Sequence, residues 1–208
     1  TETSLIEIGT TKIKISKGVP DRFLGQLVHG YQILKCIGVG DNGAVYIGRQ
    51  QSMKRLVNIK VVAEKFFENE AKKQIFLKDT IEFAKIQHPH LLTIIESFSD
   101  TIVGKNMHIL VTEYVEGLPL TKRINNKGKI EANNAVHFIE QACDALQTLH
   151  AKNLYHKNIK PSVFLVTKEG KVKLADAGLS KPELKSEYEL STEAIWYEAP
   201  ERTKGKPA

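Results

Sequence analysis

Three glycines and a lysine in the first third of the sequence have types and a spacing suited to binding phosphate. Gly38, Gly40, Gly43 and Val45 follow the pattern G-x-G-x-x-G-x-V, and Lys60 ends a Val-Asn-Ile-Lys segment fifteen residues later. Glycines let backbone N–H groups approach a phosphate because no Cβ intervenes. A lysine among apolar strand residues can hold phosphate as a point charge. A glycine hairpin tip and a solvent-facing lysine explain the same residues, so the loop alone leaves both interpretations open.

The elements around this loop distinguish it from a dinucleotide-binding turn, in which a helix follows the glycines. Here apolar and β-branched residues predict a strand on each side of the loop and a third strand around Lys60. The three-to-four spacing of Phe76, Thr80, Phe83 and Ile86 then predicts a single helix. The predicted strands of this part are 31–37, 44–49, 56–62, 91–97 and 107–114, with the helix at 66–87.

The pattern becomes helical after Glu116-Gly117, which predicts a junction between a strand-rich and a helix-rich part. Residues 132–151 predict an amphipathic helix whose apolar face carries Ala135, Val136, Ile139, Ala142, Cys143, Leu146 and Leu149. Residues 163–167 and 171–175 flank Lys168-Glu169-Gly170 and predict a hairpin. Residues 1–29 alternate in places, which fits either a small hairpin or a linker. A cleft between two such parts is a natural ligand site.

Composition excludes several classes of protein. The chain has 208 residues, 41% apolar and 26% charged, as in ordinary soluble domains. Its net charge of +6 is spread along the whole chain, which argues against nucleic-acid binding. No apolar stretch reaches the 18 or so residues of a membrane span. The chain begins with Thr1 and has no signal-like segment, so we expect a piece of a longer protein.

The cysteines and histidines suggest no covalent or metal chemistry. Cys36 and Cys143 have no C-x-x-C neighbour, which predicts buried free thiols and a reducing, cytoplasmic location. Cys143 shares one helix with His137 and Asp144, so burial explains it better than a nucleophilic role. None of the seven histidines has a second ligand at zinc spacing.

Six ordered motifs, from about Tyr31 to the end, resemble those of the protein kinase family. The glycine loop with Lys60 comes first, and after it come the αC turn at 87–90, the hinge at 112–117, the catalytic loop at 156–161, D-F-G at 176–178 and A-P-E at 199–201. The resemblance implies an α+β bilobal fold with a β-rich N-lobe, one helix (αC) and a helical C-lobe. It divides the chain into 1–29 (hairpin or linker), 30–116 (N-lobe) and 117–208 (C-lobe), the last incomplete after A-P-E.

The resemblance also implies a nucleotide site and its residues. Glycine-loop residues and Lys60 would hold the phosphates of ATP, Asp176 would hold one Mg²⁺, and Lys160 would serve in the catalytic loop. Asp79, or Glu82 one turn on, would be the αC carboxylate that pairs with Lys60. The remaining nucleotide contacts implied are Thr112 as gatekeeper, Glu113 and Val115 in the hinge, and Leu165 beneath the adenine.

The departures from the family pattern fall on the reaction chemistry. Asn158 stands where the family has the aspartate that accepts or orients the substrate hydroxyl proton, and a carboxamide is no base near neutral pH. Val163 replaces a metal-binding asparagine and has no ligand atom. Lys157 replaces an arginine and cannot make a bidentate fork to phosphate. Other departures are Asn58 above the adenine, Ala177 in D-F-G (in a column with Phe83, Ile94 and His156) and Ala194 in the substrate-docking loop.

These departures predict a pseudokinase that serves as a nucleotide-binding, regulatory or scaffolding module for a protein partner or a larger signalling protein. An atypical active serine/threonine kinase, autophosphorylated at Ser191 or Thr192, is the second hypothesis. An interaction domain that binds no nucleotide is the third. Missing C-lobe helices would leave Ile139, Leu146 and Leu149 partly uncovered, which predicts an exposed apolar face and self-association or a partner.

Overall fold

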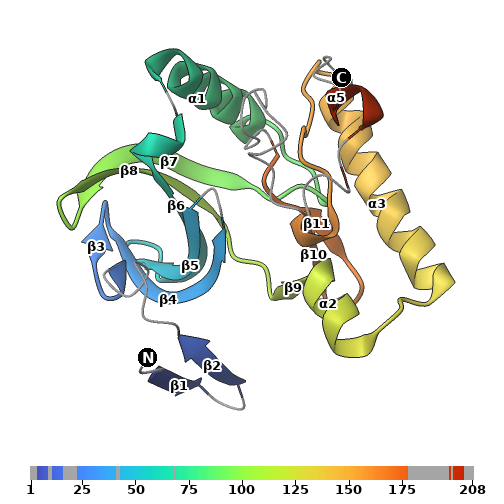
Figure 1. The fold of residues 1–208 in the computed structure, drawn as a ribbon, viewed down its shortest axis with the longest axis horizontal. Coiled ribbons are helices and arrows are strands. Elements are labelled where there is room, and N and C mark those ends of the chain that lie inside the picture. The colour runs from blue at the N-terminus through green and yellow to red at the C-terminus, as the bar shows by residue number, and fades with distance from the viewer. Residues whose placement is uncertain are drawn as a thin grey trace. The chain divides into compact units, whose positions relative to one another are not determined.

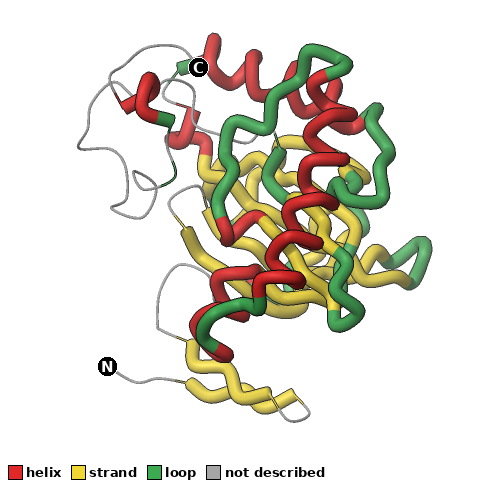
Figure 2. The backbone as a smooth tube through the Cα atoms, turned by 90° about the vertical axis from the view of Figure 1, so that its right-hand side faces the viewer, coloured by secondary structure: helices red, strands yellow, loops and turns green. Residues whose placement is uncertain are grey.

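The chain folds into two compact units, described separately below. The computed structural model describes residues 4–8, 11–15, 23–40, 43–67, 69–177, 197 and 199–203. The first unit comprises Thr1–Glu68 and Ile94–Tyr114, and the second comprises Asn69–Thr93 and Val115–Ala208. Among the described residues, every α-helix belongs to the second unit and all the longer strands belong to the first (Figure 1 and Figure 2).

A six-stranded antiparallel sheet in the order β3-β4-β5-β6-β8-β7 forms the body of the first unit. Its strands are β3 (Leu27–Val28), β4 (Tyr31–Gly40), β5 (Gly43–Gln50), β6 (Arg55–Ala63), β7 (Ile94–Ile102) and β8 (Lys105–Glu113). The five strands predicted from residue 31 onward are all present. The fourth begins three residues later than predicted, because Leu91 instead bridges Leu174 in the second unit.

The core of the first unit lies on one face of this sheet. Val57 and Ile59 of β6 and Val111 of β8 are at most 2% exposed and belong to one apolar cluster with Tyr46. Burial does not alternate along these two strands, since 107–112 of β8 and Asn58 and Val62 of β6 are buried too, so both faces of the central sheet are covered here. A short 3-10 helix, η2 (Glu64–Phe67), follows β6.

The N-terminal segment forms a separate two-stranded sheet. β1 (Ser4–Ile8) pairs antiparallel with β2 (Thr11–Ile15). Of the two interpretations of residues 1–29, the hairpin is therefore observed at 4–8 and 11–15. Residues 23–29 instead join the main sheet and its core, since β3 pairs with β4 and Phe23 and Val28 are buried.

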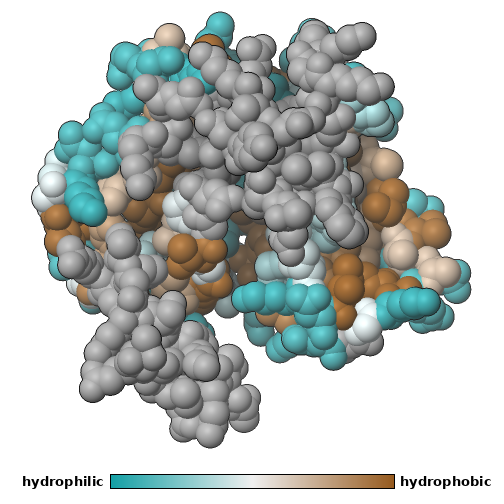
Figure 3. Space-filling view, viewed as in Figure 1, coloured by the Kyte–Doolittle hydropathy of each residue, from teal (hydrophilic) through white to brown (hydrophobic). Residues whose placement is uncertain are grey.

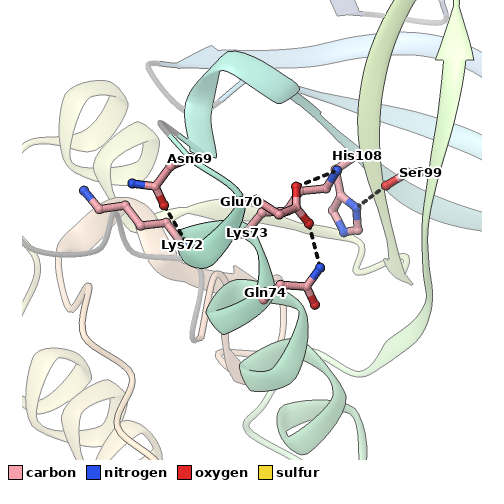
Figure 4. Close-up of polar contacts among 7 residues, drawn as sticks. All are labelled: Asn69, Glu70, Lys72, Lys73, Gln74, Ser99 and His108. Atoms are coloured by element: carbon pink, nitrogen blue, oxygen red, sulfur yellow. Dashed lines mark hydrogen bonds and ion pairs between the residues drawn. The ribbon is translucent and has the colours of Figure 1, made fainter.

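Helix α1 (Glu70–Ala84) opens the second unit and confirms the predicted helix in its central turns. The Asn69 side chain caps it by accepting a hydrogen bond from the Lys72 amide at 3.0 Å (Figure 4). Phe76, Thr80 and Phe83 are its buried residues, at the spacing that the sequence predicted.

The rest of the second unit is a small sheet with helices. The three-stranded sheet has the order β11-β10-β9, and the predicted hairpin is its β10–β11 pair. Its elements are β9 (Gly117–Pro119), α2 (Leu120–Lys127), α3 (Ala132–His150), the 3-10 helix η3 (Pro161–Val163), β10 (Phe164–Thr167), β11 (Val172–Leu174) and α5 (Pro200–Thr203).

Helix α3 begins where predicted and ends one residue earlier, at His150, but the prediction of its buried face was wrong in part. The side chains that are buried are Phe138, Gln141, Ala142, Ala145 and Leu149. Gln141 sets this orientation, since its side chain accepts from the Val172 amide at 2.8 Å and donates to the Gly170 carbonyl at 3.0 Å. A polar residue thus docks the helix on the β10–β11 hairpin, and the apolar pattern alone does not reveal it.

The same rotation exposes residues that we predicted to be covered. Val136 and Ile139 are 58% and 52% exposed, and Cys143 is exposed instead of buried. Leu146 is half-buried and Leu149 is fully buried, so the expected exposed apolar face is present at Ile139 and absent at Leu149. Brown apolar surface appears on the right of Figure 3, on the side where Figure 1 places α3.

Candidate functional site

The glycine loop is the tip of the β4–β5 hairpin. Gly38 pairs with Val45, and Gly40 pairs with Gly43 at the last described position of the ladder. Gly43 has φ +119°, and a Cβ there would overlap the carbonyl oxygen of Val61 on the next strand. A Cβ on Gly38 would meet nothing within 4 Å. Gly43 therefore has a packing reason to be glycine, whereas Gly38 leaves open space beside the backbone, as an approaching ligand requires.

Lys60 lies in the middle of the sheet, on β6 between β5 and β8. Its cross-strand partners are Val45 and Leu110, so Lys60 and Val45 share one sheet face. Asn58, two residues earlier, shares this face because successive strand residues alternate in direction. The register thus brings three of the predicted nucleotide residues of the first unit, Val45, Asn58 and Lys60, to one surface.

Asn58 is 9% exposed, and of its two polar atoms only the amide nitrogen has a hydrogen-bond partner among the described residues. Its Nδ2 donates to the main-chain carbonyl of Glu113 at 3.1 Å. Its Oδ1 is buried and has no partner among the described residues. The sequence indicated added bulk and polarity at this position; the contact with a predicted hinge residue was not foreseen.

The predicted hinge passes from the first unit into the second. Thr112 is 7% exposed and pairs with Asn58 across the strands, and Glu113 is the last residue of β8. Val115 is the residue at which the chain re-enters the second unit, and its carbonyl accepts from the Gly117 amide at 2.9 Å.

The catalytic-loop segment 156–163 and Asp176 lie in the second unit. Asn158 and Lys160 are half-buried, and Val163, in η3, is 2% exposed. The Ala175 amide donates to the Val163 carbonyl at 2.8 Å and so ties the segment to the residue before Asp176. Leu165, half-buried on β10, pairs with Pro119 and Lys173.

Two residues of these motifs have left-handed backbone conformations. Lys157 has φ +62° and Asp176 has φ +61°, values that non-glycine residues seldom adopt. Such strain costs about 1–3 kcal/mol and clusters at functional sites. The geometry here marks both positions as constrained by their surroundings.

Asp79 is ion-paired with Lys157. The Lys157 Nζ lies 3.2 Å from Asp79 Oδ2, with the two side chains 44% and 26% exposed. Glu82, the alternative αC carboxylate, instead pairs with Lys85 at 2.6 Å. The sequence analysis identified Asp79 and Lys157 in two different motifs and did not predict that they form an ion pair. Their opposite charges were the only feature of the sequence that suggested it.

His156 is buried beneath the catalytic-loop segment with 2% exposure. Burial lowers its pKa to about 4, against opposing influences from the Asp176 charge and from main-chain groups of Ala175 and His156. None of the described groups meets both the distance and the angle of a full hydrogen bond to either ring nitrogen. Phe83, of the same predicted column, is also buried, Ala177 is half-buried, and Ile94 belongs to the other unit.

The histidines at 88 and 90 make single polar contacts with residues distant in sequence. His88 Nε2 lies 3.3 Å from Asp144 Oδ2, and His90 Nδ1 lies 2.9 Å from the Val172 carbonyl. In the part of the chain that is described, no three His, Cys, Asp or Glu side chains form a metal-binding group. Cys36 is half-buried, and both cysteines are free thiols. Ser186, Tyr188, Ser191, Thr192 and Ala194 lie outside the described residues.

Comparison with known proteins identifies relatives over most of the chain. The family profile described as "Protein kinase domain" matches residues 31–208. The protein named "Probable serine/threonine-protein kinase" in Clostridium perfringens is 30% identical over 179 residues, which is 84% of this chain and 25% of that protein. Serine/threonine-protein kinase PrkC of Bacillus subtilis is 27% identical over 158 residues, 76% of this chain and 24% of that protein. The chain thus spans about a quarter of the length of these relatives.

Solved structures share the fold. The PknI kinase domain of Mycobacterium tuberculosis superposes with a TM-score of 0.70 at 20% identity, covering 88% of this chain and 67% of that one. The predicted α+β kinase-like fold is thereby confirmed. No helix in the described ranges is long and apolar enough to cross a membrane.

Proposed function

The chain belongs to the protein kinase family, and from this premise we propose that it is a pseudokinase domain that binds nucleotide and transfers phosphate poorly. One observation carries the proposal: Asn158 and Val163 stand where the reaction needs a carboxylate and a metal ligand. Phosphoryl transfer depends almost entirely on positioning and charge neutralisation. Loss of both groups therefore removes most of the catalytic contribution, while the backbone of the segment is left-handed at Lys157.

The nucleotide-binding part of the proposal rests on groups that remain. Val45 and Lys60 share one sheet face, and the glycine hairpin has open space at Gly38. In the second unit, Asp176 provides a carboxylate for one Mg²⁺, which would neutralise phosphate charge when bound. The residues fit one metal ion and not two, because the Val163 side chain has no donor atom. Lys60 would hold the phosphates, and Lys160 would lie in the catalytic loop.

ATP turnover and thermal stability, measured side by side, test the proposal. We expect the parent chain to melt at a higher temperature with Mg-ATP, since ligand at 100 times its Kd stabilises by about 2.7 kcal/mol. We expect no measurable transfer to a generic basic peptide. The Lys60→Ala variant should lose the thermal shift, whereas Lys54→Ala, at an exposed turn, should keep it. Robust turnover that depends on Lys60 would refute the pseudokinase assignment, and no shift at millimolar Mg-ATP would refute nucleotide binding.

An atypical active serine/threonine kinase is the second candidate, favoured by the retained Lys160 and Asp176 and by relatives named as serine/threonine kinases. It predicts slow autophosphorylation at Ser191 or Thr192, which mass spectrometry after incubation with Mg-ATP would detect. The combined Asn158→Asp and Val163→Asn variant should accelerate such a reaction, because it restores a base and a metal ligand.

The proposal further places the domain in a larger cytoplasmic signalling protein that acts on a protein partner. Two free thiols support a reducing compartment. The exposed Val136 and Ile139 on α3 support contact with a partner or a second copy.

A further inference from the structure

The side chain of Asn58 contains a buried hydrogen-bond acceptor that the protein itself does not satisfy. Its residue is 9% exposed, and Oδ1 has no partner among the described groups. A buried polar atom without a partner lowers the stability of the fold, so such atoms are rare and call for an explanation. A ligand that donates an N–H to Oδ1 would remove this cost.

The orientation of the amide is fixed by its other half. Nδ2 donates to the Glu113 carbonyl at 3.1 Å, and rotating the amide by half a turn would bring Oδ1 against that carbonyl, acceptor facing acceptor. The side chain of Asn58 therefore donates to the Glu113 carbonyl at the end of β8. The Asn58 side-chain oxygen is then the acceptor that remains without a partner.

The position of Asn58 connects this acceptor with the phosphate-binding residues. Asn58 and Lys60 share a sheet face and lie two residues apart on β6, a separation of about 7 Å along a strand. The partners across from Asn58 are Ile47 and Thr112, so an apolar and a hydroxyl side chain flank it. A flat ligand held at Lys60 by its phosphates would meet an apolar side chain and one buried acceptor on this face.

On the basis of the nucleotide binding proposed above, we propose that Asn58 Oδ1 accepts a hydrogen bond from the exocyclic amine of a bound adenine nucleotide and so selects the base. The Glu113 carbonyl already accepts a hydrogen bond from Asn58 Nδ2, so it contributes less to binding the amine than Oδ1 does. Asn58 is then a specificity-determining residue of the nucleotide site, and a base that lacks the amine leaves Oδ1 unpaired.

Isothermal titration calorimetry with two nucleotides tests this assignment. ATP and purine riboside 5′-triphosphate differ only by the exocyclic amine. We expect the parent chain to bind ATP roughly tenfold more tightly, as one hydrogen bond to a buried acceptor implies. In Asn58→Leu, which has a similar volume and no polar atom, the ratio of the two dissociation constants should fall to about one. Asn106→Leu, at an exposed position of β8, should keep the parent ratio.

The outcomes separate this inference from the proposed function. A parent chain that binds neither nucleotide refutes nucleotide binding itself. A parent that binds both equally, or an Asn58→Leu variant that keeps the tenfold ratio, overturns the role of Asn58 while nucleotide binding stands. If Asn58→Leu does not fold, ¹³C NMR of the parent labelled at asparagine Cγ replaces it: the Asn58 carbonyl signal should move with ATP and stay in place with the purine analogue. A signal that does not respond to ATP overturns the assignment.

Discussion

Two equally buried histidines, one in each unit, differ in how their ring nitrogens are satisfied. His108 on β8 is 2% exposed, with Nε2 2.8 Å from Ser97 Oγ and Nδ1 3.2 Å from Ser99 Oγ (the Ser99 contact is drawn in Figure 4). His156 is also 2% exposed, and neither of its nitrogens has a described partner. Serines of the sheet thus pair with both ring nitrogens of His108, whereas no described group pairs in this way with the ring nitrogens of His156.

This difference follows from what each unit is built of. In the first unit, strand register places serines of β7 beside His108, so a neighbouring strand supplies the partners. In the second unit, His156 comes directly before Lys157, whose backbone is left-handed, and burial lowers the pKa of the histidine to about 4. Unsatisfied polarity and backbone strain thus coincide in the segment that lacks the catalytic aspartate. The strained conformation of this loop therefore does not depend on the presence of the catalytic aspartate.

The largest effect should come from the sheet, at Gly43. Gly43→Ala places a Cβ against the Val61 carbonyl at φ +119°, so we expect a loss of about 3 kcal/mol or more in the free energy of unfolding. Gly38→Ala, which meets open space, should stay within about 0.5 kcal/mol of the parent chain. Urea denaturation of both variants measures this. Equal losses at the two glycines would show that the β4–β5 hairpin tip does not pack on β6 as described.

His156 should make stability depend on pH. Its pKa is about 4 in the folded chain, against 6.5 for an unperturbed histidine, so the unfolded chain binds more protons between these values. Stability is then full above about pH 6.5 and falls as the pH is lowered toward 4. From pH 7 to pH 5 we expect this residue to cost about 2 kcal/mol.

Denaturation at pH 7 and pH 5 of the parent, His156→Phe and His137→Gln checks this expectation. His156→Phe removes the titrating ring and should abolish the additional loss at pH 5. His137→Gln changes an exposed histidine and should behave like the parent. A parent chain whose stability is the same at the two pH values would mean that His156 is solvated or paired, and the contrast with His108 would disappear.

A smaller effect is expected at the Asp79–Lys157 ion pair. Both side chains are partly exposed, so screening limits their coupling free energy to about 1 kcal/mol or less. A double-mutant cycle with Asp79→Asn and Lys157→Met should give this coupling at low salt and a reduced value at about 1 M NaCl, where the Debye length is roughly 3 Å. The same cycle with Lys152→Met in place of Lys157→Met should show no coupling. A salt-independent coupling would indicate packing instead of charge.

Most of the fold could be predicted because its signals are local. Short runs of apolar and β-branched residues at 56–62 and 107–114, and the spacing of Phe76, Thr80 and Phe83, indicate strands and a helix without knowledge of their partners. The kinase motifs then supplied the order of the elements. Residues that dock one element on another were missed, as with Gln141, whose polar side chain gives no periodic signal.

The candidate site was predictable in its residues and not in their contacts. Asn58, Asp79 and Lys157 were each identified from their positions in motifs. Their partners lie 55 and 78 residues away in sequence, and only the fold brings them together. Whether a side chain contacts a carbonyl or a charged group depends on the strand register and on its rotamer. No short pattern in a single sequence specifies either of these.

The smallest effect separates the two faces of α3. Ile139 is 52% exposed, so Ile139→Ser should change the free energy of unfolding by no more than about 0.5 kcal/mol. Phe138→Ser, one position away and 4% exposed, should cost several times more, because it removes a buried aromatic ring beside the β10–β11 hairpin. Guanidinium denaturation at low micromolar concentration measures both. A large loss at Ile139 that grows with protein concentration would show that a second copy covers this face, since only association makes stability depend on concentration. A large loss of stability that does not depend on protein concentration would mean that Ile139 is buried in the core. Helix α3 would then have the buried face that its apolar pattern predicted.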